Sequence, residues 1–161
     1  MIEFTVFGHP EAQGSKRAFV IPGKNGNKPR AIVTEQGGGK WKSWRQEVTK
    51  AALEASGGPF EANALPYPAG TPVKLCVHFF LAKPPSKKKS VTLPATRPDW
   101  DKLARLICDS LSKVVYWDDG QICDVHVSKE YGTPERAEIK LCGMGAEGVR
   151  AEANLFTAGA G

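Results

Sequence analysis

Five of the six aspartates of the chain stand at the two ends of one short segment of an otherwise basic sequence, and their types and spacing could hold a metal ion. Asp99 and Asp101 lie two residues apart at the start of an apolar helical pattern in ATRPDWDKLARLICDSL, residues 95–111. Carboxylate oxygens are the ligands that Mg²⁺ prefers, and a bound magnesium ion activates water for phosphodiester hydrolysis. A neighbouring cation stabilises the charge that develops in that reaction. The other three carboxylates follow in VVYWDDGQICD and are Asp118, Asp119 and Asp124.

Ordinary helix chemistry also accounts for the first pair. Asp99 follows Pro98 and precedes the helical pattern, so its side chain can cap the first backbone N–H groups. Asp101 lies in the first turn, where a negative charge complements the helix dipole. Arg105 follows four residues later, at the spacing of a surface ion pair worth ~0.3–0.5 kcal/mol. The pair by itself therefore does not require catalysis.

The turn at residues 118–120 decides whether the carboxylates can meet. Asp and Gly together favour a tight turn, which is a sufficient local reason for these residues, and Asp124 suits the polar face of the strand that follows. The helix over residues 99–114 is predicted to be ~24 Å long, and the turn starts at its far end. Only a bent helix, an intervening strand or a second subunit would bring Asp119 to Asp99. The local pattern leaves their convergence open.

The charge is distributed unevenly along the chain of 161 residues, whose net charge is +5. Residues 16–50 hold nine Lys or Arg against two Glu, and residues 83–105 hold seven against two Asp. Residues 106–161 reverse the sign. This asymmetry predicts one basic face, as a protein that neutralises DNA phosphates needs, although many solvated surfaces are also basic. Such a face would hold DNA against the repulsion of the acidic cluster.

The hydrophobic pattern predicts one α+β domain, a mixed sheet with two main helices packed on it. Residues 8–30 and 83–98 are expected to be basic loops, with a short strand at AIVT, and residues 143–161 a flexible Gly/Ala-rich tail after a domain over 1–142. The expected regular elements are strands at 2–8 and 72–82, helices at 40–56 and 99–114, and a hairpin of 122–132 with 135–143.

Other features restrict the class of protein. The apolar runs are too short to span a membrane, and the N-terminus lacks the pattern of a signal peptide, so a cytoplasmic location is expected. The four cysteines and three histidines are too scattered for a zinc-knuckle pattern. We interpret the cysteines, each in an apolar segment, as reduced core residues.

The segment RPDWDKLARLICDSLSKVVYWDDGQICDVHVSKEYG resembles the core motif of the RusA-type Holliday-junction resolvases of bacteria and their prophages. Members of that family start a helix with Arg/Pro-Asp-x-Asp-Asn-Leu-x-Lys and follow it with a turn of the form Asp-Asp-x-Gln-[Ile/Val]. The match covers roughly residues 97–131 without gaps, and the strand before it also fits. The resemblance implies a homodimer of mixed α/β fold that cuts four-way DNA junctions symmetrically with Mg²⁺, in recombination and repair.

The resemblance also implies roles for individual residues. Asp99 and Asp101 match the paired catalytic aspartates of the family, and Asp119 matches its third carboxylate, so these three are the expected metal ligands. Arg105 stands where the family carries a functionally important lysine, and is expected to be catalytic. Lys102 stands where the family usually has asparagine, and would either lower cation affinity or contact the scissile phosphate.

Basic residues and tryptophans around the carboxylates are candidate DNA contacts. Trp100 and Trp117 flank the acidic cluster, and we favour packing over base stacking for them. A solvated loop and a phosphate-binding loop are equally good interpretations of the basic segments. The expected DNA-binding residues are Lys16, Arg17, Lys24, Lys28, Arg30, Lys87, Lys88, Lys89, Arg97 and Lys102.

Two functions therefore remain in competition. The first is a Mg²⁺-dependent endodeoxyribonuclease acting on four-way junctions. The second is a catalytically inactive protein of the same fold that binds junctions, and the departures at Lys102 and Arg105 support it. A purely structural domain with a well-capped helix is left only if the resemblance is accidental.

Overall fold

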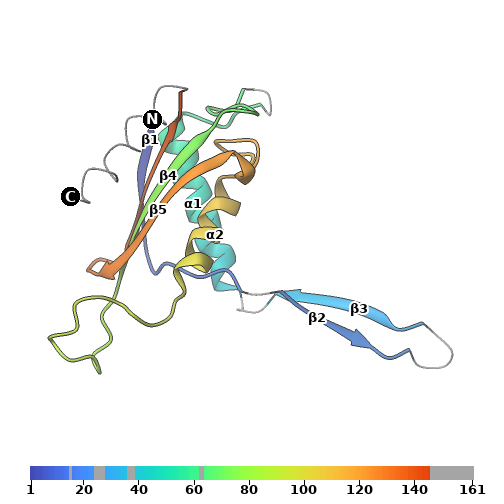
Figure 1. The fold of residues 1–161 in the computed structure, drawn as a ribbon, viewed down its shortest axis with the longest axis vertical. Helices are drawn as coiled ribbons and strands as arrows, with labels where there is room; N and C mark the ends of the chain where they lie inside the picture. Colours follow the sequence, from blue (N-terminus) through green and yellow to red (C-terminus); the bar gives the residue numbers. More distant parts are fainter. Residues whose placement is uncertain (15, 24–27, 36–38, 62–63, 146–161) are drawn as a thin grey trace, which may run out of the picture.

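The fold is a four-stranded mixed sheet with two helices packed on one of its faces (Figure 1). We describe it from a computed structural model, which describes residues 1–14, 16–23, 28–35, 39–61 and 64–145. The elements are β1 (Ile2–Phe7), β2 (Lys16–Ile21), β3 (Arg30–Glu35), α1 (Lys40–Ser56), β4 (Val73–Leu81), α2 (Trp100–Leu111), a 3₁₀ turn η1 (Asp119–Gln121), β5 (Ile122–Tyr131) and β6 (Arg136–Gly143). The sheet order is β1-β6-β4-β5, and a separate ribbon pairs β2 with β3. The predicted α+β class with two main helices is confirmed.

Strand β4 lies in the interior of the sheet, between β5 and β6, as its apolar sequence predicts. Its odd-numbered residues are buried and its even-numbered residues are half-buried on the face that no helix covers. Phe79 and Leu75 are fully buried, and each contributes ~1.5–3 kcal/mol by leaving water. The helices bury their apolar stripes in the same core, with Trp41, Trp44, Val48 and Ala52 from α1 and Leu103, Leu106, Ile107 and Leu111 from α2.

Both helices stop for local reasons. Gly57 ends α1 in a left-handed conformation with φ of 80°, and its N–H donates to the Leu53 carbonyl, as the sequence predicts. Helix α2 ends three residues earlier than predicted, because Ser112 turns extended and the buried side chains of Val115 and Tyr116 enter the core from the loop. Its twelve residues span about 18 Å.

The predicted hairpin of residues 122–143 is wrong. Both strands form, but β4 lies between them: β5 pairs with β4 in parallel, and β6 pairs antiparallel with the other edge of β4. The turn between them passes over the end of β4, where the Gly132 N–H donates to the Leu81 carbonyl at 3.0 Å. The N–H of Ala82 donates to the Glu135 carboxylate there at 2.9 Å. These hydrogen bonds hold the connection from β5 to β6 against the end of β4, where the chain crosses from one side of β4 to the other.

The expected loop at residues 8–30 is also corrected. Residues 16–21 and residue 30 belong to a two-stranded antiparallel ribbon, β2–β3, which projects away from the sheet and helices (Figure 1). The short strand expected at AIVT is present as part of β3. At the other end of the chain, β6 extends through Gly143 and the Met144 N–H donates to Pro72, so the predicted tail starts later than residue 143. The rest of that tail, residues 146–161, lies outside the described residues.

Candidate active site

The first two aspartates stand at the start of α2. Asp99 occupies the N-cap position, but its side chain does not cap the helix. It accepts a hydrogen bond from Lys102 Nζ at 2.8 Å instead. The predicted capping role of the Asp99 side chain is therefore wrong, because a charged partner one turn away competes for it. Asp101 and Arg105 are both exposed and form no ion pair with each other within the described chain, so that expected pair is also absent.

Basic neighbours make the Asp99 carboxyl more acidic. The hydrogen bond and the charge of Lys102 hold its pKa below the ordinary value, and the charges of Arg97 and Lys129 act in the same direction. Such a carboxylate is fully ionised at neutral pH and ready to bind a cation. In the structure, the partner of this carboxylate is the Lys102 ammonium.

Hydrogen bonds from two other segments to backbone carbonyls fix the start of α2. Lys129, near the end of β5, donates from Nζ to the carbonyls of Thr96 at 2.8 Å and Pro98 at 2.9 Å. The N–H of Gln13 donates to the Lys102 carbonyl at 3.2 Å, so the segment leading to the ribbon is joined to the first turn of the helix. The two aspartates thus lie on a helix end that is held from both sides.

The turn that carries Asp119 is built by its neighbours. Asp118 caps η1, with its carboxylate accepting from the Gly120 N–H at 2.9 Å. The Gln121 side-chain oxygen accepts from the N–H groups of Trp117 at 2.9 Å and Asp118 at 3.1 Å. Its amide nitrogen donates to the carbonyls of Pro68 at 2.8 Å and Thr71 at 3.0 Å. The Asp-Asp-Gly-Gln sequence therefore encodes a rigid turn that presents Asp119 to solvent.

Asp119 lies beside the later part of α2 and not beside its start. Burial raises the pKa of the Cys108 thiol to about 11, and the charges of Asp119 and Asp109 push it in the same direction. Neither charge is among the causes that shift the Asp99 carboxyl. Within the described part of the chain, no three His, Cys, Asp or Glu side chains come close enough together to hold a metal ion. One copy of the chain therefore does not bring Asp119 to Asp99 and Asp101.

The donor set at the start of α2 nevertheless suits Mg²⁺. Magnesium is commonly held in proteins by one or two carboxylates, with water and substrate phosphate completing its shell. Asp99 and Asp101 supply two carboxylates that are at least partly open to solvent. The role of all three aspartates as ligands remains a prediction.

Basic segments extend on either side of this helix end. The loop over residues 83–98 lies to one side and the β2–β3 ribbon to the other (Figure 1). Lys88, Lys89 and Arg97 are exposed and Lys87 is half-exposed in the loop. Its root is held where Lys83 Nζ donates to the Lys89 carbonyl at 3.1 Å. Of the ribbon bases, Lys28 and Arg30 are exposed, while the side chains of Lys16 and Arg17 and the whole of Lys24 lie outside the described residues.

The tryptophans and three of the four cysteines depart from the sequence interpretation. Trp100 is 57% exposed and Trp117 43%, so neither is packed away as we expected. Trp100 lines a hollow of about 480 Å³ with Val125 and Val127 of β5. Of the cysteines, Cys108 packs against the core, whereas Cys76 and Cys142 are half-buried outside it. Cys123 is exposed, because it follows η1 at the start of an edge strand. Asp124 does take the polar face, where it pairs with Lys74 and His126.

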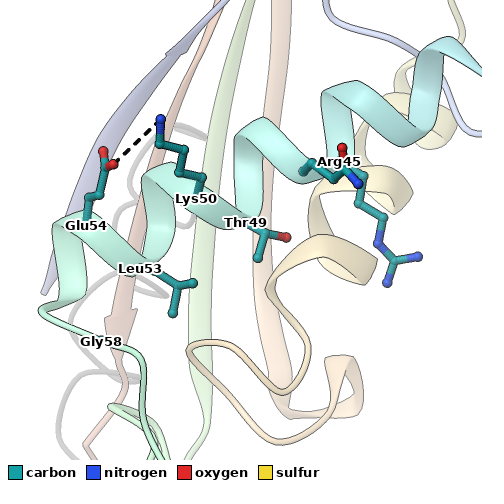
Figure 2. Close-up of a pocket in the computed structure, with 7 residues that line it drawn as sticks. Arg45, Thr49, Lys50, Leu53, Glu54 and Gly58 are labelled. Carbon is teal, nitrogen blue, oxygen red and sulfur yellow. Dashed lines mark ion pairs between the residues drawn. The ribbon is translucent and has the colours of Figure 1, made fainter.

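A second hollow, of about 410 Å³, runs along the later part of α1 (Figure 2). Arg45 and Thr49 line it, and both bond to the end of α2, at the carbonyls of Asp109 and Ser110. Its one carboxylate, Glu54, pairs with Lys50 at 4.0 Å.

No helix in the described parts of the chain has the length and apolar character needed to cross a membrane.

Comparison with known proteins places these features in a family. The family model of endodeoxyribonuclease RusA matches residues 22–142, a range that contains the carboxylates, β3, both helices, β4, β5 and all but the last residue of β6. The chain is also similar to the uncharacterized protein YqaN of Bacillus subtilis (strain 168). The two are 30% identical over 145 residues, which cover 87% of this chain and 94% of that protein. The chain belongs to the RusA endodeoxyribonuclease family.

Proposed function

We propose that this endodeoxyribonuclease resolves four-way DNA junctions by paired symmetric cuts, with Mg²⁺ held at the start of α2. The observation that carries the proposal is the position of Asp99 and Asp101, two residues apart in the chain at a braced helix end between two basic extensions. Carboxylates in such surroundings bind a cation, and the basic segments hold the polyanion against their repulsion. Family membership supports the junction as substrate.

The side chains at this helix end have separable roles. Asp99 and Asp101 would hold the ion, which when bound supplies an activated water and stabilises charge on the phosphate. Arg105, one turn after Asp101, is exposed and has no ion-pair partner in the described chain, so its guanidinium can bind a phosphate oxygen. Lys102 would leave Asp99 when the ion or a phosphate arrives, because a single ammonium competes weakly with a divalent cation.

We further propose that the active form is a homodimer, paired across β5. Strand β5 is an edge strand, with Val125 47% exposed on it and Trp100 57% exposed beside it. Asp99 and Asp119 lie toward opposite ends of α2. Two copies related by a two-fold axis and running antiparallel at β5 would set the Asp119 end of one beside the Asp99 end of the other. Each active site would then take Asp99 and Asp101 from one chain and Asp119 from its partner.

Cleavage of a synthetic four-way junction tests the activity. The purified protein, incubated with Mg²⁺ at several salt concentrations, is expected to cut two opposed strands, and the variant Asp101→Asn is expected to bind without cutting. Glu47→Gln, on an exposed position of α1, is the matched control and should cut like the wild type. A wild-type protein that leaves junctions intact throughout contradicts the enzyme proposal, and an active Asp101→Asn variant contradicts the site.

A subunit-mixing experiment tests the shared site. Asp101→Asn and Asp119→Asn are each expected to be inactive, but co-refolded heterodimers would hold one site with both changes and one intact site. Such heterodimers should nick a supercoiled plasmid that extrudes a cruciform, without linearising it. No recovery of nicking on mixing would mean that all three aspartates act within one chain.

A catalytically inactive junction-binding protein is the second candidate. The 2.8 Å ion pair between Lys102 and Asp99 favours it, since it occupies one of the two neighbouring carboxylates. Tight, salt-dependent junction binding with no cleavage under any divalent cation would support it.

A further inference from the structure

The β2–β3 ribbon presents apolar side chains to solvent far from the core. Phe19 is 47% exposed, Val20 64%, Ile21 44% and Ile32 36%. Isolated two-stranded ribbons are marginally stable in water, and an exposed apolar surface of this kind marks a binding site. The ribbon therefore has the features of an element that is completed by a partner.

One face of the ribbon combines apolar and basic groups. Phe19 stands opposite Ile32 and Ile21 opposite Arg30 in the strand register, so these four residues share a face. Ile21, Lys28, Arg30 and Ile32 also line a hollow of about 620 Å³ near the end of the ribbon. Between Glu11 and Glu35 the chain carries five bases and no acid, namely Lys16, Arg17, Lys24, Lys28 and Arg30.

The positive charge of the ribbon segment indicates which class of partner it binds. A second copy of the ribbon would bring an equally basic segment alongside and would be repelled. A polyanion is attracted, and the basic tip would displace its counterions. A two-stranded ribbon has strands about 4.8 Å apart and fits the major groove of duplex DNA, which is ~12 Å wide. Apolar side chains on its face can contact thymine methyl groups there.

The base of the ribbon connects it to the carboxylates. Strand β2 begins three residues after Gln13, whose N–H donates to the Lys102 carbonyl in the first turn of α2. Before that, the Gly8 N–H donates to the Glu135 carbonyl and the His9 ring bonds the Glu135 carboxylate at 2.7 Å. The ribbon therefore starts from a fixed point beside Asp99 and Asp101 and extends outward (Figure 1).

We propose that the β2–β3 ribbon lies in the major groove of a duplex arm of the substrate, with Phe19 and Ile32 on base edges and Lys28 and Arg30 on phosphates. This inference rests on the proposed function and adds a duplex-gripping site outside the carboxylates. Six residues of strand reach about 20 Å, which corresponds to about six base pairs. Junction arms of that length beyond the cut are thus needed for full affinity.

Two double variants test the ribbon independently of catalysis. Phe19→Ser/Ile32→Thr removes apolar contacts, and Lys28→Gln/Arg30→Gln removes two cations without altering the apolar pairs. The matched control is Lys50→Gln/Lys140→Gln, which removes two exposed cations paired with Glu54 and Glu3 elsewhere on the body. Binding to a four-way junction is measured without divalent cation, together with protection of guanine N7, a major-groove atom, from dimethyl sulfate.

The wild type and the control are expected to protect guanines within about six base pairs of the cut, and both ribbon variants to lose that protection. Loss of two phosphate contacts lowers the slope of log affinity against log salt by about 1.8. From 50 to 200 mM salt the wild type should therefore lose about twelve-fold more affinity than Lys28→Gln/Arg30→Gln. The control should match the wild type.

Other outcomes separate the two proposals. If the wild type cuts junctions and both ribbon variants give its footprint and salt slope, the ribbon inference is wrong and the proposed function stands. If the ribbon variants become monomeric with the footprint otherwise unchanged, the ribbon is a subunit contact and the inference is again wrong. If the wild type binds no branched or duplex DNA, both proposals fail.

Discussion

Replacement of Gln121 is expected to destabilise the turn that carries Asp119. Its side chain makes four hydrogen bonds, which join the N–H groups of Trp117 and Asp118 to the carbonyls of Pro68 and Thr71. Each contributes ~0.5–1.5 kcal/mol in net terms, and the site is only half-buried. Gln121→Ala should therefore lower the free energy of unfolding by about 2–4 kcal/mol.

The isosteric variant Gln121→Glu separates hydrogen bonding from packing. It keeps the oxygen that accepts from Trp117 and Asp118 but replaces the donating nitrogen by an oxygen facing two carbonyl oxygens. Two donations are lost and two repulsions are created, so we expect a loss of about 2–3 kcal/mol with no change in side-chain volume. The matched control is Gln46→Glu, an exposed amide on α1 with no hydrogen bond in the described chain, which should change stability by less than ~0.5 kcal/mol.

Urea unfolding followed by circular dichroism measures these differences, and junction cleavage is assayed at a temperature where every variant is folded. Both Gln121 variants should cut more slowly than the wild type even then, because Asp119 is no longer held in place. A Gln121→Glu variant as stable as the Gln46→Glu control would refute the argument that the glutamine fixes the turn through its amide.

Three further predictions concern the helix α2 and the cysteines. Lys102→Asn should raise the pKa of Asp99 toward the ordinary 3.8, since Lys102 is the main cause of its lowering, and carboxyl-carbon NMR titration measures it. Because the folded pKa is lowered, this carboxylate stabilises the fold above pH 3.8 and loses that contribution as the pH falls through the folded pKa, so the variant should show a weaker acid dependence of unfolding. Leu106→Ala, at a fully buried position, should cost about 3–4 kcal/mol in urea unfolding, and a loss under 1 kcal/mol would contradict its place in the core. In the native protein a thiol reagent should modify the exposed Cys123 far faster than Cys108, whose pKa is raised to about 11, and mass spectrometry of the labelled peptides would show the reverse order if this assignment were wrong.

Elements set by local periodicity were predictable from the sequence. The apolar spacing from Trp41 onward and the glycine at residue 57 specify α1 and its end, and the apolar run at residues 73–81 specifies an interior strand. The end of α2 was less predictable because Val115 and Tyr116 continue the apolar pattern while facing the core from a loop. A pattern of buried residues does not reveal the backbone that carries them.

The pairing of strands that are far apart in the chain could not be predicted from the sequence. The turn near residues 132–135 is visible as Gly and Pro, but nothing local says that β6 crosses β4 before it pairs. The ribbon was hidden because its apolar runs, around Phe19 and Ile32, are short and lie within Gly-, Pro- and Lys-rich sequence. Its strands are stabilised by each other, and the flanking composition resembles a loop.

The candidate site was predictable in its parts but not in its assembly. The Asp-x-Asp spacing locates the first two carboxylates, and the Asp-Asp-Gly-Gln sequence locates a tight turn. The sequence does not show that Lys102 would bind Asp99 in place of a cap, because two partners compete for one side chain. Helix length alone indicated that Asp119 would lie far from Asp99, and the structure agrees for a single copy.

The position of β6 determines the order in which the sheet can be completed during synthesis. Strand β6 lies between β1 and β4 and pairs with both, yet it follows every other described strand in the chain. Until residues 136–143 leave the ribosome, β1 lacks its hydrogen-bonding neighbour and one edge of β4 is open, although α1, α2 and β5 are already made. A nascent chain cannot close its core before this last strand inserts, so α2 and its carboxylates are made before the sheet on which the helix packs is complete. The final packing of this nuclease therefore depends on the described strand that is translated last.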